Sequence, residues 1–278
     1  MIAENSSYAR IVDFLHDLGQ RTLAEQLSPA DVSRKHDRSL VTRFDRENEA
    51  ALSRIILELF PGDGIVGEEG SRAPSSTGRK WLIDPIDGTR QFVSGQPLWG
   101  ILLACLEGDE PVFGAMYHPS TQSVVWAQRD GGCFQVFGDG SSQRLRVSDV
   151  DEISSAYLLH NGVEFARRAN SQPQLIELCR AVDAERGYAD SFGHIEVISG
   201  RADVMVDFLP EAHDIAAVAL CVREAGGRWI SVGGGSPSRP SRVTVTSNAA
   251  LADAVVDALH PTESRRASRP GMGGSHSA

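Results

Sequence analysis

Apolar side chains recur every three to four residues in two segments near the N-terminus, and this spacing predicts two amphipathic helices. The first segment contains Ile11, Val12, Phe14, Leu15 and Leu18, and the second contains Ala50, Ala51, Leu52, Ile55, Ile56, Leu59 and Phe60. The sequence Pro61-Gly62-Asp63-Gly64 should end the second helix, because proline and glycine disfavour its continuation. We therefore expect two helices ahead of the first strand, which is predicted at residues 65–67.

Apolar runs between residues 98 and 136 have a different character, because turn-forming residues interrupt them at short intervals. The interruptions are Gly108-Asp109-Glu110-Pro111, His118-Pro119-Ser120 and Gly131-Gly132. Short apolar runs between such breaks are typical of strands joined by tight turns. We predict an antiparallel meander here, and hence an N-terminal half at residues 1–150 that combines helices with a mainly antiparallel sheet.

The C-terminal half alternates between helical and strand patterns. The predicted order is a helix near 174–185, a helix near 192–199, a strand at 204–206, a helix after Asp214, and strands at 228–232 and 243–246. Such alternation is typical of α/β layers. We place this half at residues 151–260, and we predict that residues 261–278, which lack apolar periodicity, form a disordered tail.

The segment Trp81-Leu82-Ile83-Asp84-Pro85-Ile86-Asp87-Gly88-Thr89 carries candidate metal chemistry. Residues 81–83 predict a buried strand that Asp84-Pro85 breaks into a loop. Pro85 fixes one φ angle and Gly88 allows a sharp bend, so the two carboxylates can converge while Ile86 offers its backbone carbonyl. Oxygen donors suit a hard cation, with Mg2+ first, although a lone Asp-x-x-Asp-Gly sequence is more often an ordinary turn.

Two further acids at the ends of predicted elements favour the metal interpretation over the ordinary turn. Glu68 follows the strand predicted at residues 65–67, and Asp214 opens an amphipathic segment that runs to Gly226-Gly227. Brought together with Asp84 and Asp87, these acids would repel one another strongly unless cations compensated their charge.

With these motifs the chain resembles the inositol monophosphatase family of metal-dependent phosphatases. The family signature Asp-Pro-Ile-Asp-Gly-Thr matches residues 84–89 at every position. The signature Trp-Asp-x-Ala-Ala…Glu-Ala-Gly-Gly is similar to His213-Asp214-Ile215-Ala216-Ala217…Glu224-Ala225-Gly226-Gly227, with His213 in place of Trp. A third motif, Lys35-His36-Asp37…Leu40-Val41-Thr42…Asp45, is similar to Lys-x-Asp…Val-Thr-x-x-Asp in the family. The resemblance covers about residues 8–260 and implies an α/β (α+β) fold, a layered α-β-α-β-α sandwich with the site between its halves.

The resemblance also implies a set of metal ligands. One ion would lie between Glu68, Asp84 and the Ile86 carbonyl, and a second ion would lie among Asp84, Asp87 and Asp214. Asp84 would bridge the two ions. We therefore expect two or three Mg2+ ions in each active site.

Catalytic and outer residues follow from the same resemblance. Glu68 and Thr89 would orient and deprotonate the attacking water, and the backbone N–H groups of Gly88 and Thr89 would meet the phosphate. Thr42 and Asp45 would form an outer shell or a third ion site. Their place before an apolar periodic run predicts a helix N-cap equally well.

Asp190 and Asp207 lie where the resembling family places substrate contacts, and Asp87 is a further expected substrate contact. Acids there favour a cationic or hydroxyl-rich alcohol. The pattern Tyr188-Ala189-Asp190-Ser191-Phe192-Gly193 is similar to the histidinol-phosphatase branch of the family, although Ala189 replaces its Gly. We therefore predict hydrolysis of a small phosphate monoester, with histidinol phosphate first. Inositol 1-phosphate or an aminocyclitol phosphate are the alternatives, and a non-catalytic metal- or phosphate-binding protein is a third interpretation.

Several other polar residues are expected to be ordinary. Glu69 should be a solvated neighbour of Glu68, since adjacent strand residues face opposite ways. Lys35 should be exposed, and the alternative is that it neutralises acid near the site. The remaining histidines, among them His118, His160 and His194, fall outside the motifs. His213 is expected to fill the position of the family Trp with a hydrogen-bonded ring, and contact with a substrate or ligand is the alternative.

Composition narrows the classes of partner. The 278 residues carry a net charge of −10, which argues against nucleic acid or an anionic membrane as a partner. The longest apolar run, at residues 101–106, is too short to span a bilayer, and the scattered cysteines show no metal or disulfide spacing. We therefore predict a cytoplasmic protein. Members of the family often dimerise, but no apolar stripe identifies a homodimer interface here.

Overall fold

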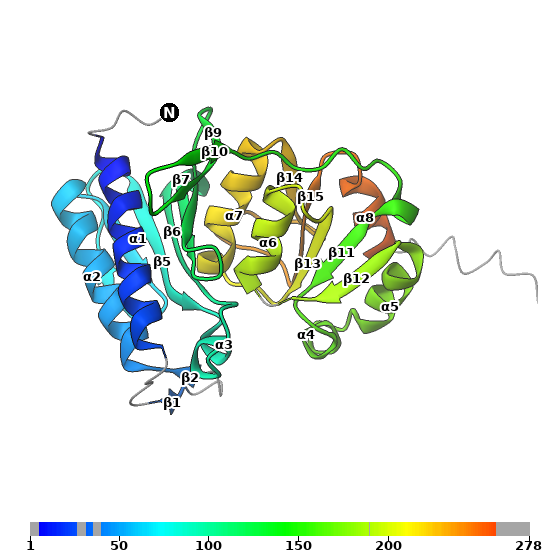
Figure 1. Ribbon diagram of the computed structural model, residues 1–278, viewed down its shortest axis with the longest axis horizontal. Helices are drawn as coiled ribbons and strands as arrows, with labels where there is room; N and C mark the ends of the chain where they lie inside the picture. Colours follow the sequence, from blue (N-terminus) through cyan, green and yellow to red (C-terminus); the bar gives the residue numbers. More distant parts are fainter. Residues whose placement is uncertain (1–5, 27–31, 36–39, 189, 260–278) are drawn as a thin grey trace, which may run out of the picture.

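The computed structural model describes residues 6–26, 32–35, 40–188 and 190–259 (Figure 1). The predicted tail at 261–278 lies outside the described residues, as do His36 and Asp37 of the third motif and Ala189. Within the described part, no helix combines the length and the apolar character needed to cross a bilayer.

Two large sheets and three layers of helices form most of the described part of the molecule. The larger sheet has eight strands in the order β10, β9, β8, β7, β6, β5, β3, β4. Its strands are β3 (Gly64–Gly67), β4 (Arg72–Ala73), β5 (Arg79–Asp87), β6 (Gly100–Glu107), β7 (Glu110–His118), β8 (Ser123–Gln128), β9 (Gly132–Phe137) and β10 (Ser142–Arg144). The smaller sheet has five strands in the order β12, β11, β13, β15, β14, which are β11 (Tyr157–His160), β12 (Ala184–Gly187), β13 (Val204–Phe208), β14 (Gly227–Ser231) and β15 (Val243–Asn248).

The helices cover these sheets in three separate layers. Figure 1 shows α1 (Ser7–Glu25) and α2 (Arg43–Leu59) on the outer face of the larger sheet, where their apolar faces pack on β5, β6 and β7. Next come α6 (Asp190–Ile198) and α7 (Ala212–Glu224), which fill the space between the sheets. The third layer, α5 (Gln172–Ala181) and α8 (Ala252–Leu259), covers the far face of the smaller sheet. This order confirms the α-β-α-β-α sandwich.

The remaining elements are short. They are β1 (Ser33–Arg34), which pairs with β2 (Leu40–Val41), the helices α3 (Thr89–Val93) and α4 (Val163–Arg168), and a 3-10 turn at Ile153–Ser155. The two predicted N-terminal helices are confirmed by α1 and α2, and the predicted meander is confirmed by β6 to β9, which pair antiparallel in sequence order.

The end of β5 differs from the prediction. The strand does not stop at Ile83 but continues to Asp87 through a bulge, because Asp84 pairs with Leu102 and Asp87 pairs with Gly100. One extra residue on β5 shifts the alternation, so Asp84 and Asp87 reach the same side of the sheet. Pro85 lies in this bulge and has no N–H group to donate to a sheet ladder.

The C-terminal half also contains corrections. The helix predicted near 174–185 ends at Ala181, and Ala184 and Glu185 belong to β12. The prediction missed β11, α4 and α8, although Val255, Val256 and Leu259 in α8 carry a helical spacing. A division of the chain near residue 150 stays a prediction, since α6 and α7 pack closely between the two sheets.

The buried ring of His118, at the end of β7, should make the stability of the fold depend on pH. Its ring is buried against Phe192, Nδ1 shares a hydrogen bond with Ser120 Oγ at 2.9 Å, and Nε2 has no partner among the described residues. Burial lowers the pKa of His118 from 6.5 to about 3. The folded protein therefore keeps this ring neutral at pH 5, whereas the unfolded chain protonates it below pH 6.5, so acid favours unfolding.

We expect the free energy of unfolding of the wild type to fall by about 2 kcal/mol more than that of His118→Gln between pH 8 and pH 5. Urea titrations of both proteins at the two pH values measure this difference. Equal losses in the two proteins would show that His118 does not contribute to acid sensitivity.

Candidate active site

The bulged end of β5 presents two buried carboxylates to the space beneath α7. Asp84 and Asp87 are only 2% and 7% exposed. Asp84 Oδ1 accepts a hydrogen bond from the Ile86 N–H at 3.1 Å, which stabilises the bulge. Asp87 Oδ2 accepts one from the Ser191 N–H at 2.7 Å, which joins the first turn of α6 to β5. Local backbone bonds therefore hold both carboxylates in place.

Glu68 lies beside Asp84 because β3 and β5 are parallel neighbours. Gly67 pairs with Ile83, and the Glu68 N–H donates to the Ile83 carbonyl at 3.0 Å. Parallel strands end at the same edge of a sheet, so the residues that follow them meet there.

The buried Glu49 of α2 holds the turn that carries Glu68. Its Oε2 accepts from the Glu69 N–H at 2.6 Å, and its Oε1 accepts from the Ser71 N–H at 2.7 Å. The sequence analysis missed Glu49. Its signal was an acid on the apolar face of a predicted helix, one turn before Leu52.

Two groups of potential metal ligands share Asp84. In the first, donor atoms of Asp84, Asp87 and Asp214 all lie within 4.8 Å of one another. In the second, donor atoms of Glu68, Asp84 and His213 lie within the same limit. The oxygen-rich donor set fits divalent cations such as Mg2+. The structure thus brings together the predicted carboxylates and adds His213, which the prediction did not include among the ligands.

The electrostatics of this cluster also favour a cation. Burial raises the pKa of Asp84 well above its usual range, and the charges of Glu68 and Asp87 raise it further. Burial and the charge of Asp214 raise the pKa of Asp87 to about 7. Burial likewise raises the pKa of Asp214. The protein alone therefore does not stabilise these carboxylates as anions, whereas bound divalent ions would do so.

Lys35 and Glu69 differ from their expected surroundings. Lys35 Nζ lies 2.7 Å from Glu68 Oε1 and 2.5 Å from Glu69 Oε1, and the Glu69 side chain is only 8% exposed. The predictions of an exposed lysine and a solvated Glu69 are therefore wrong. Burial is the largest cause of the raised pKa of Glu69, while the Lys35 contact opposes it. Lys35 therefore compensates part of the negative charge at this edge of the site.

Thr42, Asp45 and Thr89 form a connected group beside the carboxylates. Thr42 caps α2 in a capping box, in which Asp45 Oδ2 accepts from the Thr42 N–H at 2.6 Å. The N-cap interpretation is therefore confirmed. Asp45 Oδ1 also lies 3.3 Å from Thr89 Oγ1, which is 3.1 Å from the Ile86 carbonyl oxygen. Gly88 precedes Thr89 in a left-handed conformation, with φ at 81°, and α3 begins at Thr89.

A cavity of about 80 Å3 opens directly beside the candidate metal ligands. It is lined by Asp87, Asn161, Phe165, Asp190, Ser191, His194, Asp207, Phe208, Leu209, Pro210 and Asp214. The two predicted substrate residues, Asp190 and Asp207, are thus brought together next to the carboxylate cluster. None of these described lining residues is Lys or Arg.

Asp207 and Asp190 have different surroundings in this cavity. Asp207 accepts from Asn161 Nδ2 at 2.5 Å and lies 3.2 Å from His194 Nε2, and His194 Nδ1 is 2.9 Å from Thr246 Oγ1. The described residues give the Asp190 carboxylate no hydrogen-bond donor, and burial raises its pKa well above the usual range. Hydrogen bonds therefore fix the Asp207 side chain in the wall of the cavity, whereas the Asp190 carboxylate can accept a hydrogen bond from a ligand. Asn161 and His194 are site residues that the sequence motifs do not indicate.

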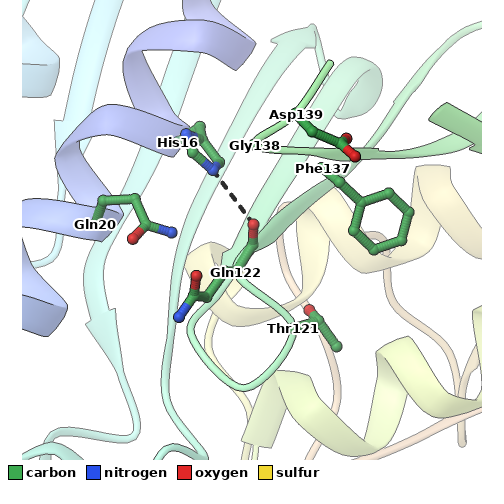
Figure 2. A pocket seen from close by; sticks show the side chains of 7 residues that line it. All are labelled: His16, Gln20, Thr121, Gln122, Phe137, Gly138 and Asp139. Carbon is green, nitrogen blue, oxygen red and sulfur yellow. Dashed lines mark hydrogen bonds between the residues drawn. The ribbon is translucent and has the colours of Figure 1, made fainter. Parts of the chain in front are cut away.

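A second hollow lies elsewhere, between α1 and the turns that flank β8 and β9. Figure 2 shows its lining residues, which are His16, Gln20, Thr121, Gln122, Phe137, Gly138 and Asp139. Its volume is about 490 Å3, and His16 Nε2 lies 3.2 Å from the Gln122 carbonyl oxygen across it. It contains none of the predicted site residues and only one acid, so it offers no comparable ligand set.

Comparisons with known proteins agree with this geometry. The family model described as the inositol monophosphatase family matches residues 16–264. A histidinol-phosphatase of Mycobacterium tuberculosis is 35% identical over 230 residues, which cover 82% of this chain and 88% of that protein. An inositol-1-monophosphatase of Rhizobium meliloti is 30% identical over 235 residues, covering 82% and 85%. The solved structure of the Thermotoga maritima IMPase TM1415 has a TM-score of 0.76 at 26% identity and covers 89% of this chain and 94% of that one.

Proposed function

The chain belongs to the inositol monophosphatase family of phosphatases, and we propose that its substrate is a small phosphate monoester with a cationic alcohol, histidinol phosphate first. The observation that carries this proposal is the acidic cavity beside the carboxylate cluster, where Asp190 and Asp207 face a space with no Lys or Arg among the described lining residues. A second phosphate would be repelled there, whereas an amine or imidazolium would be attracted. Relatives named histidinol-phosphatase are consistent with this choice.

We assign the metal ligands as Glu68, Asp84, Asp87 and Asp214, with the Ile86 carbonyl as the further predicted ligand, and Mg2+ as the first candidate ion. Two or three bound ions would neutralise the phosphoryl oxygens and lower the pKa of a coordinated water. Asp84 is the only described residue common to both ligand groups, so it is the proposed bridge.

Protein groups would orient the water and the phosphate. We propose that Thr89 Oγ1 accepts a hydrogen bond from the attacking water and keeps its own proton in a hydrogen bond to Asp45, which lies 3.3 Å away, so that Thr89 orients the water. Glu68, once its contact with Lys35 is broken, would accept the one proton that the water loses. The N–H groups of Gly88 and Thr89, at the start of α3, would bind a phosphate oxygen, with Asp87 beside them.

Phosphate release from a panel of substrates tests this function. The panel contains histidinol phosphate, inositol 1-phosphate, an aminocyclitol phosphate and fructose 1,6-bisphosphate, each measured with Mg2+ and with EDTA. We expect the highest kcat/KM for histidinol phosphate, at least about tenfold above inositol 1-phosphate, since a charge-assisted hydrogen bond is worth about 1.5–3 kcal/mol.

A preference for a neutral cyclitol phosphate would contradict the cationic substrate and leave the phosphatase assignment intact. A preference for fructose 1,6-bisphosphate would contradict the interpretation of the acidic cavity. If the protein binds Mg2+ but releases phosphate from none of the substrates, the result would favour the interpretation as a non-catalytic binding protein.

A further inference from the structure

His213 lies among the carboxylates rather than apart from them. It is the second residue of α7, directly before Asp214, and its side chain is 16% exposed. Its Nε2 lies 3.3 Å from Asp214 Oδ1. A ring nitrogen of His213 and carboxylate oxygens of Glu68 and Asp84 all lie within 4.8 Å of one another. The imidazole therefore faces acids that belong to both ligand groups.

An imidazole nitrogen carries a lone pair, which is a good ligand for divalent transition metals. The compact group that His213 forms with Glu68 and Asp84 therefore offers one nitrogen donor beside carboxylate oxygens to a single ion.

The Ile86 carbonyl, the third predicted ligand of the first ion, also has a partner within the protein. Its oxygen is 3.1 Å from Thr89 Oγ1, which can donate a hydrogen bond to one of its two lone pairs. His213 shares a compact group with Glu68 and Asp84 and would add a further donor there. The other group, formed by Asp84, Asp87 and Asp214, contains oxygen donors only. The two ion positions thus differ in ligand chemistry.

We infer that His213 is a nitrogen ligand of the ion held by Glu68 and Asp84, and that this position prefers a first-row transition cation to Mg2+. The inference rests on the proposed function, because it concerns the same metal cluster. Imidazole nitrogen suits Zn2+, Co2+ and Ni2+, whereas carboxylate oxygen suits Mg2+ and Mn2+. The oxygen-only position should keep its preference for Mg2+.

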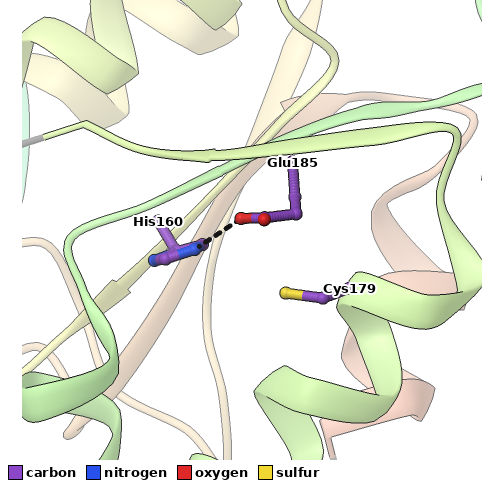
Figure 3. A group of neighbouring side chains, drawn as sticks. All are labelled: His160, Cys179 and Glu185. Carbon is purple, nitrogen blue, oxygen red and sulfur yellow. Dashed lines mark hydrogen bonds and ion pairs between the residues drawn. The ribbon is translucent and has the colours of Figure 1, made fainter.

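A second group of potential metal ligands also contains a histidine, and it must be disabled before the metal affinities are compared. Figure 3 shows His160, Cys179 and Glu185, whose donor atoms also lie within 4.8 Å of one another, with His160 Nε2 3.1 Å from Glu185 Oε2. These residues come from β11, α5 and β12, outside the candidate active site. They would take up the same metals, so His160→Gln is the matched background for all measurements.

Metal-stripped His160→Gln and His160→Gln/His213→Gln proteins are compared by two measurements. Calorimetric titration with Co2+ and with Mg2+ gives affinities, and pulsed electron paramagnetic resonance of added Mn2+ reports nitrogen coupling from a bound imidazole. We expect His213→Gln to weaken Co2+ at least about tenfold, to change Mg2+ less than about threefold, and to remove the nitrogen coupling. His213→Trp serves as a second variant that keeps a ring but no nitrogen lone pair.

Each outcome separates the two proposals. Unchanged nitrogen coupling in both His213 variants, or equal losses for Co2+ and Mg2+, would overturn His213 as a ligand. Phosphatase activity in that case would still support the proposed function. If the His213 variants lose the nitrogen coupling but the protein releases phosphate from no phosphate monoester, the result would support His213 as a metal ligand and contradict the proposed function.

Discussion

Asp84→Asn should raise the melting temperature of the metal-free protein and at the same time abolish phosphate release. Asp84 is buried among like charges, and burial together with Glu68 and Asp87 raises its pKa. A neutral amide of the same shape removes that repulsion, which we expect to stabilise the metal-free fold on the order of 2 kcal/mol, or roughly 5 °C. The amide also removes the carboxylate that both ligand groups share, so kcat/KM should fall by about 10³-fold or more. Thermal melts with and without Mg2+, beside phosphate-release assays, measure both effects.

Asp63→Asn, directly before β3 of the same sheet, is the matched control. Asp63 is also buried, but its partners are donors: Trp81 Nε1 at 2.9 Å and Arg79 Nε at 3.1 Å. Its amide variant should lower the melting temperature, because it leaves Arg79 without its carboxylate, and should keep metal-induced stabilisation. A lower melting temperature for Asp84→Asn as well, or a retained Mg2+ response, would refute Asp84 as the shared ligand.

The sequence alone was sufficient to predict the acids that β3 and β5 bring together at one edge of the larger sheet. Apolar runs predicted the strands at residues 65–67 and 81–83, and each run ends in acid. Parallel pairing of β3 and β5 then places Glu68 beside Asp84. The bulge that directs Asp87 to the same side depends on one extra residue opposite β6, which a period-two pattern does not report. Only Pro85 gave a local sign of it.

The residues that support the site could not be predicted from the sequence, because their hydrogen-bond partners are distant in the chain. Glu49 binds the Glu69 N–H across 20 positions, Asn161 binds Asp207 across 46, and His194 contacts Thr246 across 52. Periodicity reports the neighbours of a residue within its own helix or strand, so it cannot pair such groups. Even so, a charged or amide side chain inside an apolar pattern is a sign that a buried partner exists.

Asp190→Asn should reduce kcat/KM for histidinol phosphate by about 10- to 100-fold and change inositol 1-phosphate less than about threefold, since only the former offers a cation to the lost charge. The fold should persist, because Asn tolerates the positive φ of 52° found at Asp190. Asp207→Asn is the informative contrast, since it disturbs His194 and Asn161 and should weaken stability and both substrates together. Steady-state kinetics with both substrates on the three proteins decide the matter: equal losses for both substrates in Asp190→Asn would mean that Asp190 shapes the cavity without selecting a cationic alcohol.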